Sequence, residues 1–310
     1  MQRRRILSGL GAALTASALA GFTLGPAQAA TGSPAAKADS PHVLAYYQTQ
    51  YQDGSYVSPL PLKGIATDVE VAAFHLNGDG SIHLNDDPPS DAKFDQVWKD
   101  VAELQSSGTK VHALLGGAAQ GTYANLAADF ERYYKPLHDT VEKYGLDGVD
   151  LDIEETFSLE NTKKLIERLR TDFGTDFSVI LTPVATDLAG TSNFSGGFDY
   201  AQLEREAGSQ ISFYTGQFYC GWGDLGGTGS YDNVIGNGFS PSRVVAGALT
   251  NPANCQGYVE PGTLASTLTA LKDKHQGFGG VAGWEYFNAV EVDGTGPATW
   301  YAHVRKAAGG

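Results

Sequence analysis

The segment Asp147–Glu154 reads DGVDLDIE and carries an acidic side chain at every second position from Asp150 onward. Successive side chains of a β-strand point to opposite faces, so Asp150, Asp152 and Glu154 share one face. The opposite face carries Val149, Leu151 and Ile153. An apolar face suits the helix-covered side of a buried strand, and burying three acids without a task would be costly. The pattern therefore predicts a central strand whose row of carboxyl groups ends at Glu154.

Closely spaced carboxyl groups cannot all ionise easily, so some of them stay protonated. The outermost member, Glu154, is then placed to protonate a leaving-group oxygen. Asp152 lies one pleat below and can hydrogen-bond both Glu154 and a substrate group. Two other interpretations of the acids are a solvated edge strand and a Mg²⁺ or Ca²⁺ site. The apolar opposite face disfavours the first, and a hydrophobic strand differs from the glycine-containing loop of common calcium sites.

One carboxyl group is well placed as an acid, and no second one is evident as a nucleophile on an opposing strand. The two-carboxylate scheme of glycoside hydrolysis therefore fits poorly, whereas its substrate-assisted variant fits well. In that variant the 2-acetamido oxygen of the sugar attacks its own anomeric carbon. Asp152 can accept a hydrogen bond from the acetamide N–H, and Tyr219 can donate its hydroxyl to the acetamide oxygen. The predicted chemistry is retaining cleavage of a β-linked N-acetylglucosamine.

Eight apolar, β-branched runs predict the strands that must position these groups. They are His42–Tyr47, Val69–Leu76, Lys110–Leu115, Gly148–Ile153, Phe177–Val184, Ile211–Tyr219, Arg243–Leu249 and Gly280–Glu285. Between them, helical periodicity predicts helices at Phe94–Ser107, Ala124–Tyr144, Leu159–Phe173, Tyr200–Glu206 and Leu264–His275. Alternating strands and helices, with nearly continuous apolar strands, indicate a parallel sheet. We expect one (β/α)₈ barrel over residues 41–308, with its chemistry at the C-terminal ends of the strands.

The N-terminus predicts export. Arg3, Arg4 and Arg5 precede an apolar run, and Ala27-Gln28-Ala29 offers a cleavage site. We expect residues 1–29 to be a signal peptide of the Sec or twin-arginine type, and residues 30–40 to be a flexible lead-in. A membrane anchor is the alternative. The protein would then be secreted, without membrane attachment once the signal is removed.

The composition narrows the class of partner. The 310 residues include 21 Lys and Arg against 35 Asp and Glu, a net charge of −14. This acidity argues against binding nucleic acid or anionic membranes. Two cysteines, Cys220 and Cys255, can form a disulfide after export, and they are too few for a cysteine-type zinc site. The seven His show no HExxH spacing, so we expect no metal and no cofactor. We also expect a monomer.

The same residues resemble family 18 of the glycoside hydrolases. Its pattern DGxDxDxE is matched at all five positions, from Asp147 to Glu154. The third strand ends in Gly116-Gly117, the sixth in Gln217-Phe218-Tyr219, and the eighth in Gly283-Trp284-Glu285-Tyr286-Phe287. The four landmarks occur in order, and the resemblance spans essentially the whole chain after the expected signal.

The resemblance implies a role for each matching residue. Glu154 would be the acid and base, Asp152 would orient the acetamide, and Asp150 would tune Asp152. Gln217 and Tyr219 would contact the acetamido sugar. Trp284 would form the floor beneath the sugar on the non-reducing side of the cut. Further candidate contacts are Gly116 and Gly117, whose missing side chains allow close approach of a sugar, and Tyr46, for which core packing is the alternative.

Two branches of the family compete. Chitinases commonly carry Met-x-Tyr-Asp at the sixth strand, where this chain has Gln217-Phe218-Tyr219-Cys220. A Gln at this position is typical of endo-β-N-acetylglucosaminidases, and Phe74–Asp86, Gly116–Tyr123 and Gly283–Asn288 resemble secreted fungal-type members of that branch. That branch cuts the GlcNAc-β1,4-GlcNAc bond of the N-glycan chitobiose core. Short bacterial chitinases, which act on chitin and its oligosaccharides, are the near alternative, and a non-catalytic acetamido-sugar-binding protein is a third. About 30 residues, 250–279, separate the last two strands, so no large inserted subdomain is expected and the groove should be open.

Overall fold

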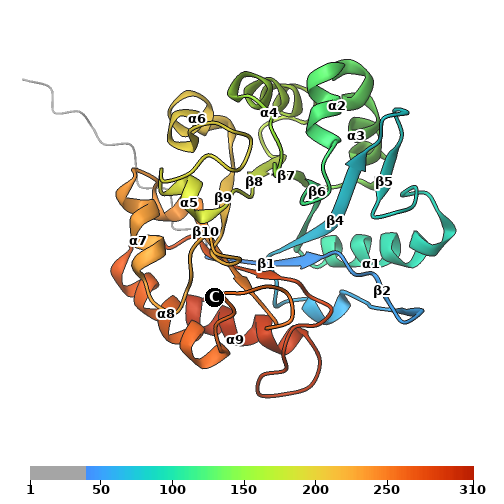
Figure 1. Ribbon diagram of the computed structural model, residues 1–310. Helices are drawn as coiled ribbons and strands as arrows, with labels where there is room; N and C mark the ends of the chain where they lie inside the picture. Colours follow the sequence, from blue (N-terminus) through green and yellow to red (C-terminus); the bar gives the residue numbers. More distant parts are fainter. Residues whose placement is uncertain (1–39) are drawn as a thin grey trace, which may run out of the picture. The chain divides into compact units, whose positions relative to one another are not determined.

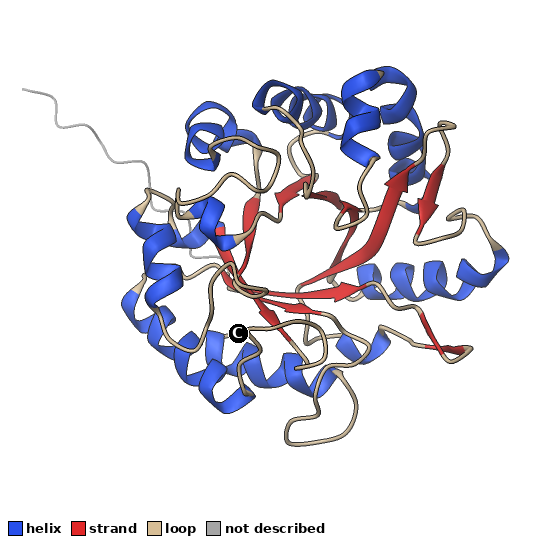
Figure 2. Ribbon diagram, viewed as in Figure 1, coloured by secondary structure: helices blue, strands red, loops and turns tan. Residues whose placement is uncertain are grey.

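The computed structural model describes residues 40–310, and the expected signal peptide and most of the lead-in lie outside them. Eight parallel strands form a closed barrel, surrounded by helices (Figures 1 and 2). In order around the barrel they are β1 (His42–Tyr47), β4 (Asp68–Leu76), β6 (Lys110–Gly116), β7 (Gly148–Asp152), β8 (Ser178–Leu181), β9 (Phe213–Gln217), β10 (Val244–Leu249) and β11 (Gly280–Trp284). Strand β1 pairs with both β11 and β4, which closes the barrel. The predicted TIM-barrel fold in a single domain is confirmed.

Helices cover the outer surface of the barrel. They are α1 (Asp95–Ser106), α2 (Thr122–Ala128), α3 (Phe130–Tyr144), α4 (Leu159–Phe173), α5 (Ala185–Leu188), α6 (Tyr200–Ala207), α7 (Gly229–Gly236), α8 (Pro261–Lys274) and α9 (Ala298–Ala308). Short 3₁₀ turns lie at Leu60–Leu62, Ala92–Phe94, Gly208–Gln210 and Pro241–Arg243. Among the described residues, no helix is long and apolar enough to cross a membrane. The connection from β10 to β11 contains α8 and no inserted subdomain within its described residues.

The expectation of one helix over Ala124–Tyr144 was wrong. The chain breaks at Asp129, whose φ of −150° and ψ of 86° are not helical. Its carboxylate accepts a hydrogen bond from the backbone N–H of Arg132 and so caps the start of α3. Both helices bury their apolar faces against the barrel, so helical periodicity continues across the break. The hydrophobic pattern therefore gave no sign of the cap at Asp129.

Additional strands extend the rim beside β1 and β4. Strand β5 (Ile82–Leu84) pairs antiparallel with the end of β4, and β2 (Tyr51–Gln52) forms a small hairpin with β3 (Ser55–Tyr56). Neither element was among the eight predicted strands. Both lie at the C-terminal ends of the neighbouring barrel strands, where they add walls to the rim.

The two faces of β7 separate as its alternation predicts. Val149, Leu151 and Ile153 are fully buried in the layer between barrel and helices. The barrel interior holds a second apolar cluster that includes Leu44, Tyr46, Leu114, Ile180 and Phe213. Asp150 shares this interior, so the acids rise along the inside of the barrel toward its C-terminal rim.

A buried ionic group stabilises the opposite end of the barrel interior. Asp68 lies 2.7 Å from the His42 Nδ1 and 3.1 Å from the His112 Nε2. Burial acts to raise the pKa of Asp68, but the hydrogen bonds from His112 and His42 outweigh it and hold the pKa well below its usual range. Asp147, the first acid of the motif, accepts from the N–H of Val111 and so ties β7 to β6. Asp147 lies outside the alternating row of acids, and these contacts give it a structural role.

Candidate active site

The predicted row of carboxyl groups forms a graded column. Asp150 is fully buried, Asp152 is 7% exposed, and Glu154 follows the end of β7 at the rim. The Thr182 hydroxyl donates to the Asp150 Oδ2 at 2.6 Å and lies 3.2 Å from the Tyr46 hydroxyl. Each step along the strand thus moves a carboxyl from the dry interior toward solvent.

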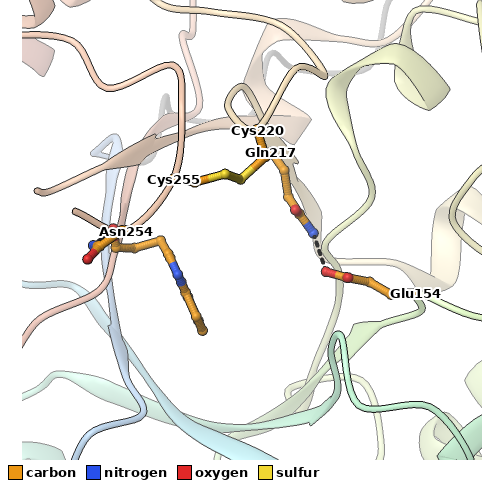
Figure 3. The surroundings of a disulfide bond; sticks show 6 residues. Glu154, Gln217, Cys220, Asn254 and Cys255 are labelled. Carbon is orange, nitrogen blue, oxygen red and sulfur yellow. Dashed lines mark hydrogen bonds between the residues drawn. A yellow bond between two sulfur atoms is a disulfide. The ribbon is translucent and has the colours of Figure 1, made fainter. Parts of the chain in front are cut away.

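One amide joins the two outer acids. The Gln217 Nε2 lies 3.2 Å from the Asp152 Oδ1, 3.2 Å from the Glu154 Oε1 and 3.0 Å from the Thr182 carbonyl oxygen. Figure 3 shows the Gln217 side chain pointing toward Glu154 at one side of the barrel mouth. Because β9 and β7 are not neighbours, this contact requires the curvature of the closed barrel.

The environment favours protonated carboxyl groups. Burial raises the pKa of Asp150 to about 7, against hydrogen bonds from Thr182 and Tyr46 that lower it. Burial, followed by the charges of Glu154 and Asp150, raises the pKa of Asp152. Burial also raises the pKa of Glu154, while the hydrogen bond from Gln217 lowers it. The column therefore retains protons near neutral pH, which is what an acid catalyst requires.

A cavity of about 450 Å³ opens above the column. Its lining brings together Asp152, Glu154, Gln217, Tyr219 and Trp284 from the ends of three strands, β7, β9 and β11. Burial holds the pKa of Tyr219 well above its usual range, so the side chain stays a neutral hydroxyl and can donate a hydrogen bond. Within the described residues, no group of three or more His, Cys, Asp or Glu side chains is arranged to hold a metal ion.

Gly116 and Gly117 also line this cavity. Both have positive φ angles, +98° and +93°. A Cβ atom on Gly116 would lie 2.4 Å from the Asp152 carbonyl oxygen, and one on Gly117 would lie 3.5 Å from the Asp152 Oδ2. The glycines let β6 end directly against the carboxylate column, and they leave the space above Asp152 open.

Tyr46 lies below the cavity and is not among its lining residues. It is 1% exposed, its hydroxyl reaches Thr182, and its ring centroid lies 5.4 Å from that of Trp284. The structure thus places Tyr46 beneath Trp284, where it supports the cavity floor without facing the open space. The packing alternative describes this position better than a direct sugar contact.

Cys220 and Cys255 form a disulfide that joins the loops after β9 and β10. Figure 3 shows it beside Gln217. The Cys220 backbone N–H also donates to the Gln256 carbonyl oxygen at 2.8 Å. Because Cys220 directly follows Tyr219, the crosslink restrains the segment that carries both the tyrosine and the amide.

Sequence reasoning missed several residues of this site. Thr182 bridges Tyr46 and Asp150 directly after the end of β8, yet it was not among the predicted site residues. Phe194 lines the cavity from the long connection between β8 and α6. Its ring centroid lies 4.8 Å from that of Trp222. No periodic pattern marks a loop residue such as Phe194. The position of Thr182 at a strand end, in contrast, could have identified it as a site residue.

A closed (β/α)₈ barrel with a column of buried carboxyl groups of raised pKa, an amide bridge and a tryptophan at the rim is typical of a glycoside hydrolase. Residues 42–229 match the family model "Glycosyl hydrolases family 18", and the chain belongs to this family. Its substrate is accordingly a carbohydrate that contains N-acetylglucosamine.

Solved structures resemble almost the whole described chain. The chitinase ChiC from Aspergillus fumigatus is 46% identical, with a TM-score of 0.79, over 84% of this chain and 97% of that one. A fungal endo-β-N-acetylglucosaminidase of family 18 is 39% identical, with a TM-score of 0.82, over 87% of this chain and 98% of that one. Chitinase 2 of Rhizopus oligosporus is 29% identical over 211 residues, 61% of this chain. The match covers 36% of that relative, so the chain spans about a third of its length.

Proposed function

We propose that this protein is a retaining, substrate-assisted endo-β-N-acetylglucosaminidase that hydrolyses the GlcNAc-β1,4-GlcNAc bond of the N-glycan core. The observation that carries the proposal is the amide of Gln217, which lies within hydrogen-bond distance of both Asp152 and Glu154. The side chains to which we assign the roles of acid, acetamide-orienting carboxyl and amide donor all line one small space beside Tyr219, which supports the proposal.

In the proposed first step, Glu154 protonates the oxygen of the bond being cut, while the acetamide oxygen of the same sugar attacks the anomeric carbon. Asp152 accepts a hydrogen bond from the acetamide N–H, and Tyr219 donates to the acetamide oxygen. The product is a cyclic oxazolinium ion and a free leaving group. In the second step, Glu154 takes a proton from water, which attacks the anomeric carbon and restores the acetamide, so the configuration is retained. Asp150 holds or releases a proton beneath Asp152 as the charge above it changes.

The N-glycan core is proposed as substrate on two supports. Gln217 stands where chitinases of this family commonly carry Met-x-Tyr-Asp, and a fungal endo-β-N-acetylglucosaminidase shares the fold over 87% of this chain. The short connection between β10 and β11 leaves the cleft without a subdomain wall, which suits attack within a chain. Chitin is the second candidate substrate, because the chitinase from Aspergillus fumigatus has the higher identity of 46%.

Two digests separate these substrates. The protein is incubated with a high-mannose glycoprotein and, separately, with chitin hexamer. The masses of the products are then measured by mass spectrometry. We expect the glycoprotein to keep a single GlcNAc at each released site and the hexamer to remain intact. Cleavage of the hexamer with an untouched glycoprotein would assign the protein to the chitinases instead. A thiazoline analogue of the oxazolinium ion should inhibit in either case, and a lack of inhibition would contradict substrate assistance.

Export is proposed from the N-terminal pattern. Residues 1–29 would be removed as a signal peptide, with the barrel released outside the cell. N-terminal sequencing of the protein from culture medium tests this, with a start at residue 30 as the expected result. Retention of the intact chain in the cell membrane would favour the anchor alternative.

A further inference from the structure

A second cavity adjoins the catalytic one and has no role in the bond cleavage described above. Its volume is about 790 Å³, compared with about 450 Å³ for the catalytic cavity. The two share Gln48, His75 and Ala119, so they form one continuous cleft along the rim. The second cavity, called the side groove below, is bounded by the loop after β1, the β4–β5 hairpin and Glu285, which follows Trp284.

The side groove differs chemically from the catalytic cavity. Amide, hydroxyl, imidazole and carboxylate groups dominate its lining: Gln48, Thr49, Gln50, His75, Asn77, His83 and Asn85, together with Asp86, Gln120, Thr122 and Glu285. In the catalytic cavity, apolar and aromatic residues such as Leu114, Phe194 and Trp222 stand beside the acids. An acetamido methyl group suits the apolar cavity, whereas a sugar that carries only hydroxyl groups needs a partner for each one it desolvates.

The groove walls are fixed before any ligand binds. The Asn85 Nδ2 donates to the Gln48 carbonyl oxygen at 3.0 Å and to the Gln50 Oε1 at 2.8 Å. Gln50 in turn donates to the Ala72 carbonyl oxygen at 3.0 Å. Preorganised polar groups lose little entropy on binding, so such a wall favours affinity for a matching ligand.

The charges of the groove disfavour an anionic ligand. The cation in the lining, Lys93, is ion-paired with Asp87, and the Glu285 carboxylate accepts from both the N–H and the hydroxyl of Thr49. Burial lowers the pKa of His75, so this imidazole is neutral at neutral pH. A phosphate or carboxylate ligand would find no unpaired cation among these groups, and the chain as a whole has a net charge of −14.

An exposed aromatic ring stands in the groove. Among residues 40–310, two large hydrophobic side chains count as exposed, Tyr51 at 37% and Phe194 at 42%. Both lie on this cleft, Tyr51 in the side groove and Phe194 in the catalytic cavity. The Tyr51 ring packs against that of Tyr56, with the two centroids 5.5 Å apart, and its hydroxyl also donates to the Lys93 carbonyl oxygen. An exposed, fixed ring offers the apolar contact that the C–H faces of a sugar require.

We propose that the side groove binds the mannose-bearing arm of the glycan, with Tyr51 as its aromatic platform. This inference rests on the proposed function, because the catalytic cavity must hold the core N-acetylglucosamine for the arm to reach the groove. The groove thereby contributes to substrate specificity. Neutral hexoses can hydrogen-bond to its polar wall, while acetamido sugars fit the catalytic cavity better.

The test compares a long and a short substrate. The long substrate carries a high-mannose glycan, and the short one carries a single mannose on the chitobiose core. Tyr51→Ala should lower the ratio of kcat/KM for the long over the short substrate about five- to tenfold, because a lost aromatic contact accounts for a change of that size. Tyr51→Phe keeps the ring but removes the hydrogen bond to Lys93, so its ratio should stay within about twofold of the wild type. Thermal melting confirms that both variants are folded.

The outcomes separate the groove from the catalytic proposal. If the wild-type protein cleaves the glycoprotein and Tyr51→Ala leaves the ratio unchanged, the groove inference is overturned while the proposed function stands. If Tyr51→Phe lowers the ratio as much as Tyr51→Ala, the ring is not a platform and the inference is also overturned. If the wild type cleaves chitin hexamer but no glycoprotein, the proposed function fails, and the mannose assignment fails with it.

Discussion

Replacing Gln217 by Met should move the pH dependence of the reaction to higher pH. The amide lies within hydrogen-bond distance of Asp152 and Glu154, and its hydrogen bond lowers the pKa of Glu154. Methionine has a similar size but no donor. Without the donor, the charged form of the acid loses a stabilising contact, so the pKa rises and the proton is retained to higher pH.

The size of the shift follows from the geometry. The amide has two hydrogens and three acceptors within 3.2 Å, so it serves each carboxylate for part of the time. Hydrogen bonds to charged groups contribute about 1.5–3 kcal/mol, and long shared ones belong at the lower end. Since about 1.4 kcal/mol corresponds to one pKa unit, we expect the alkaline limb to move upward by about one unit.

The assay is a profile of kcat/KM against pH, whose alkaline limb reports the essential acid of the free enzyme. The rate itself will also fall, because the proposed contact to the acetamide is lost, so the position of the limb is the informative quantity. Gln105→Met is a matched control. Gln105 donates to Asp147 at 2.8 Å at the other end of β7, so its removal should leave the limb in place.

An alkaline limb that stays fixed in Gln217→Met, or moves to lower pH, would refute this reasoning. The first result would mean that the amide does not stabilise the ionised acid. The second would mean that the amide acts mainly on the protonated form, for example as an acceptor from the Glu154 hydroxyl.

Three further predictions follow from the same contacts. Glu154→Gln should lower kcat about 10²- to 10⁴-fold while glycan binding persists in calorimetry, and retained turnover would contradict its role as the acid. Asp68→Asn should lower the free energy of unfolding in urea at pH 7 by about 2 kcal/mol, because the hydrogen bonds of His42 and His112 to a charged carboxylate are lost. The stabilisation by Asp68 should be complete above about pH 5 and should fall progressively at lower pH, since its folded-state pKa lies below its unfolded-state value. Replacing both Cys220 and Cys255 by Ser should lower the free energy of unfolding by about 3–4 kcal/mol, as expected for a 35-residue loop, and an unchanged melting curve would argue against the crosslink.

The sequence by itself determined the row of acids and the elements around it. Strand alternation is a local property, so the shared face of Asp150, Asp152 and Glu154 followed from their spacing alone. The strand count and the barrel followed from repeated apolar runs, each of which is likewise local. The break at Asp129 was missed because a single capping residue changes the backbone without interrupting the hydrophobic pattern.

Only the tertiary structure decided which distant residues meet. Gln217 reaches Glu154, 63 positions away, because the barrel curves β9 toward β7 at one side of its mouth. Tyr46 has an aromatic ring and a hydroxyl group that could contact a sugar, but closure of the barrel buries it beneath Trp284. The side groove is formed by segments far apart in the chain, among them those around Tyr51, Asn85, Gln120 and Glu285, that no sequence spacing relates. Local patterns record which way a side chain faces, whereas its neighbours across a cavity depend on the closed geometry of the whole sheet.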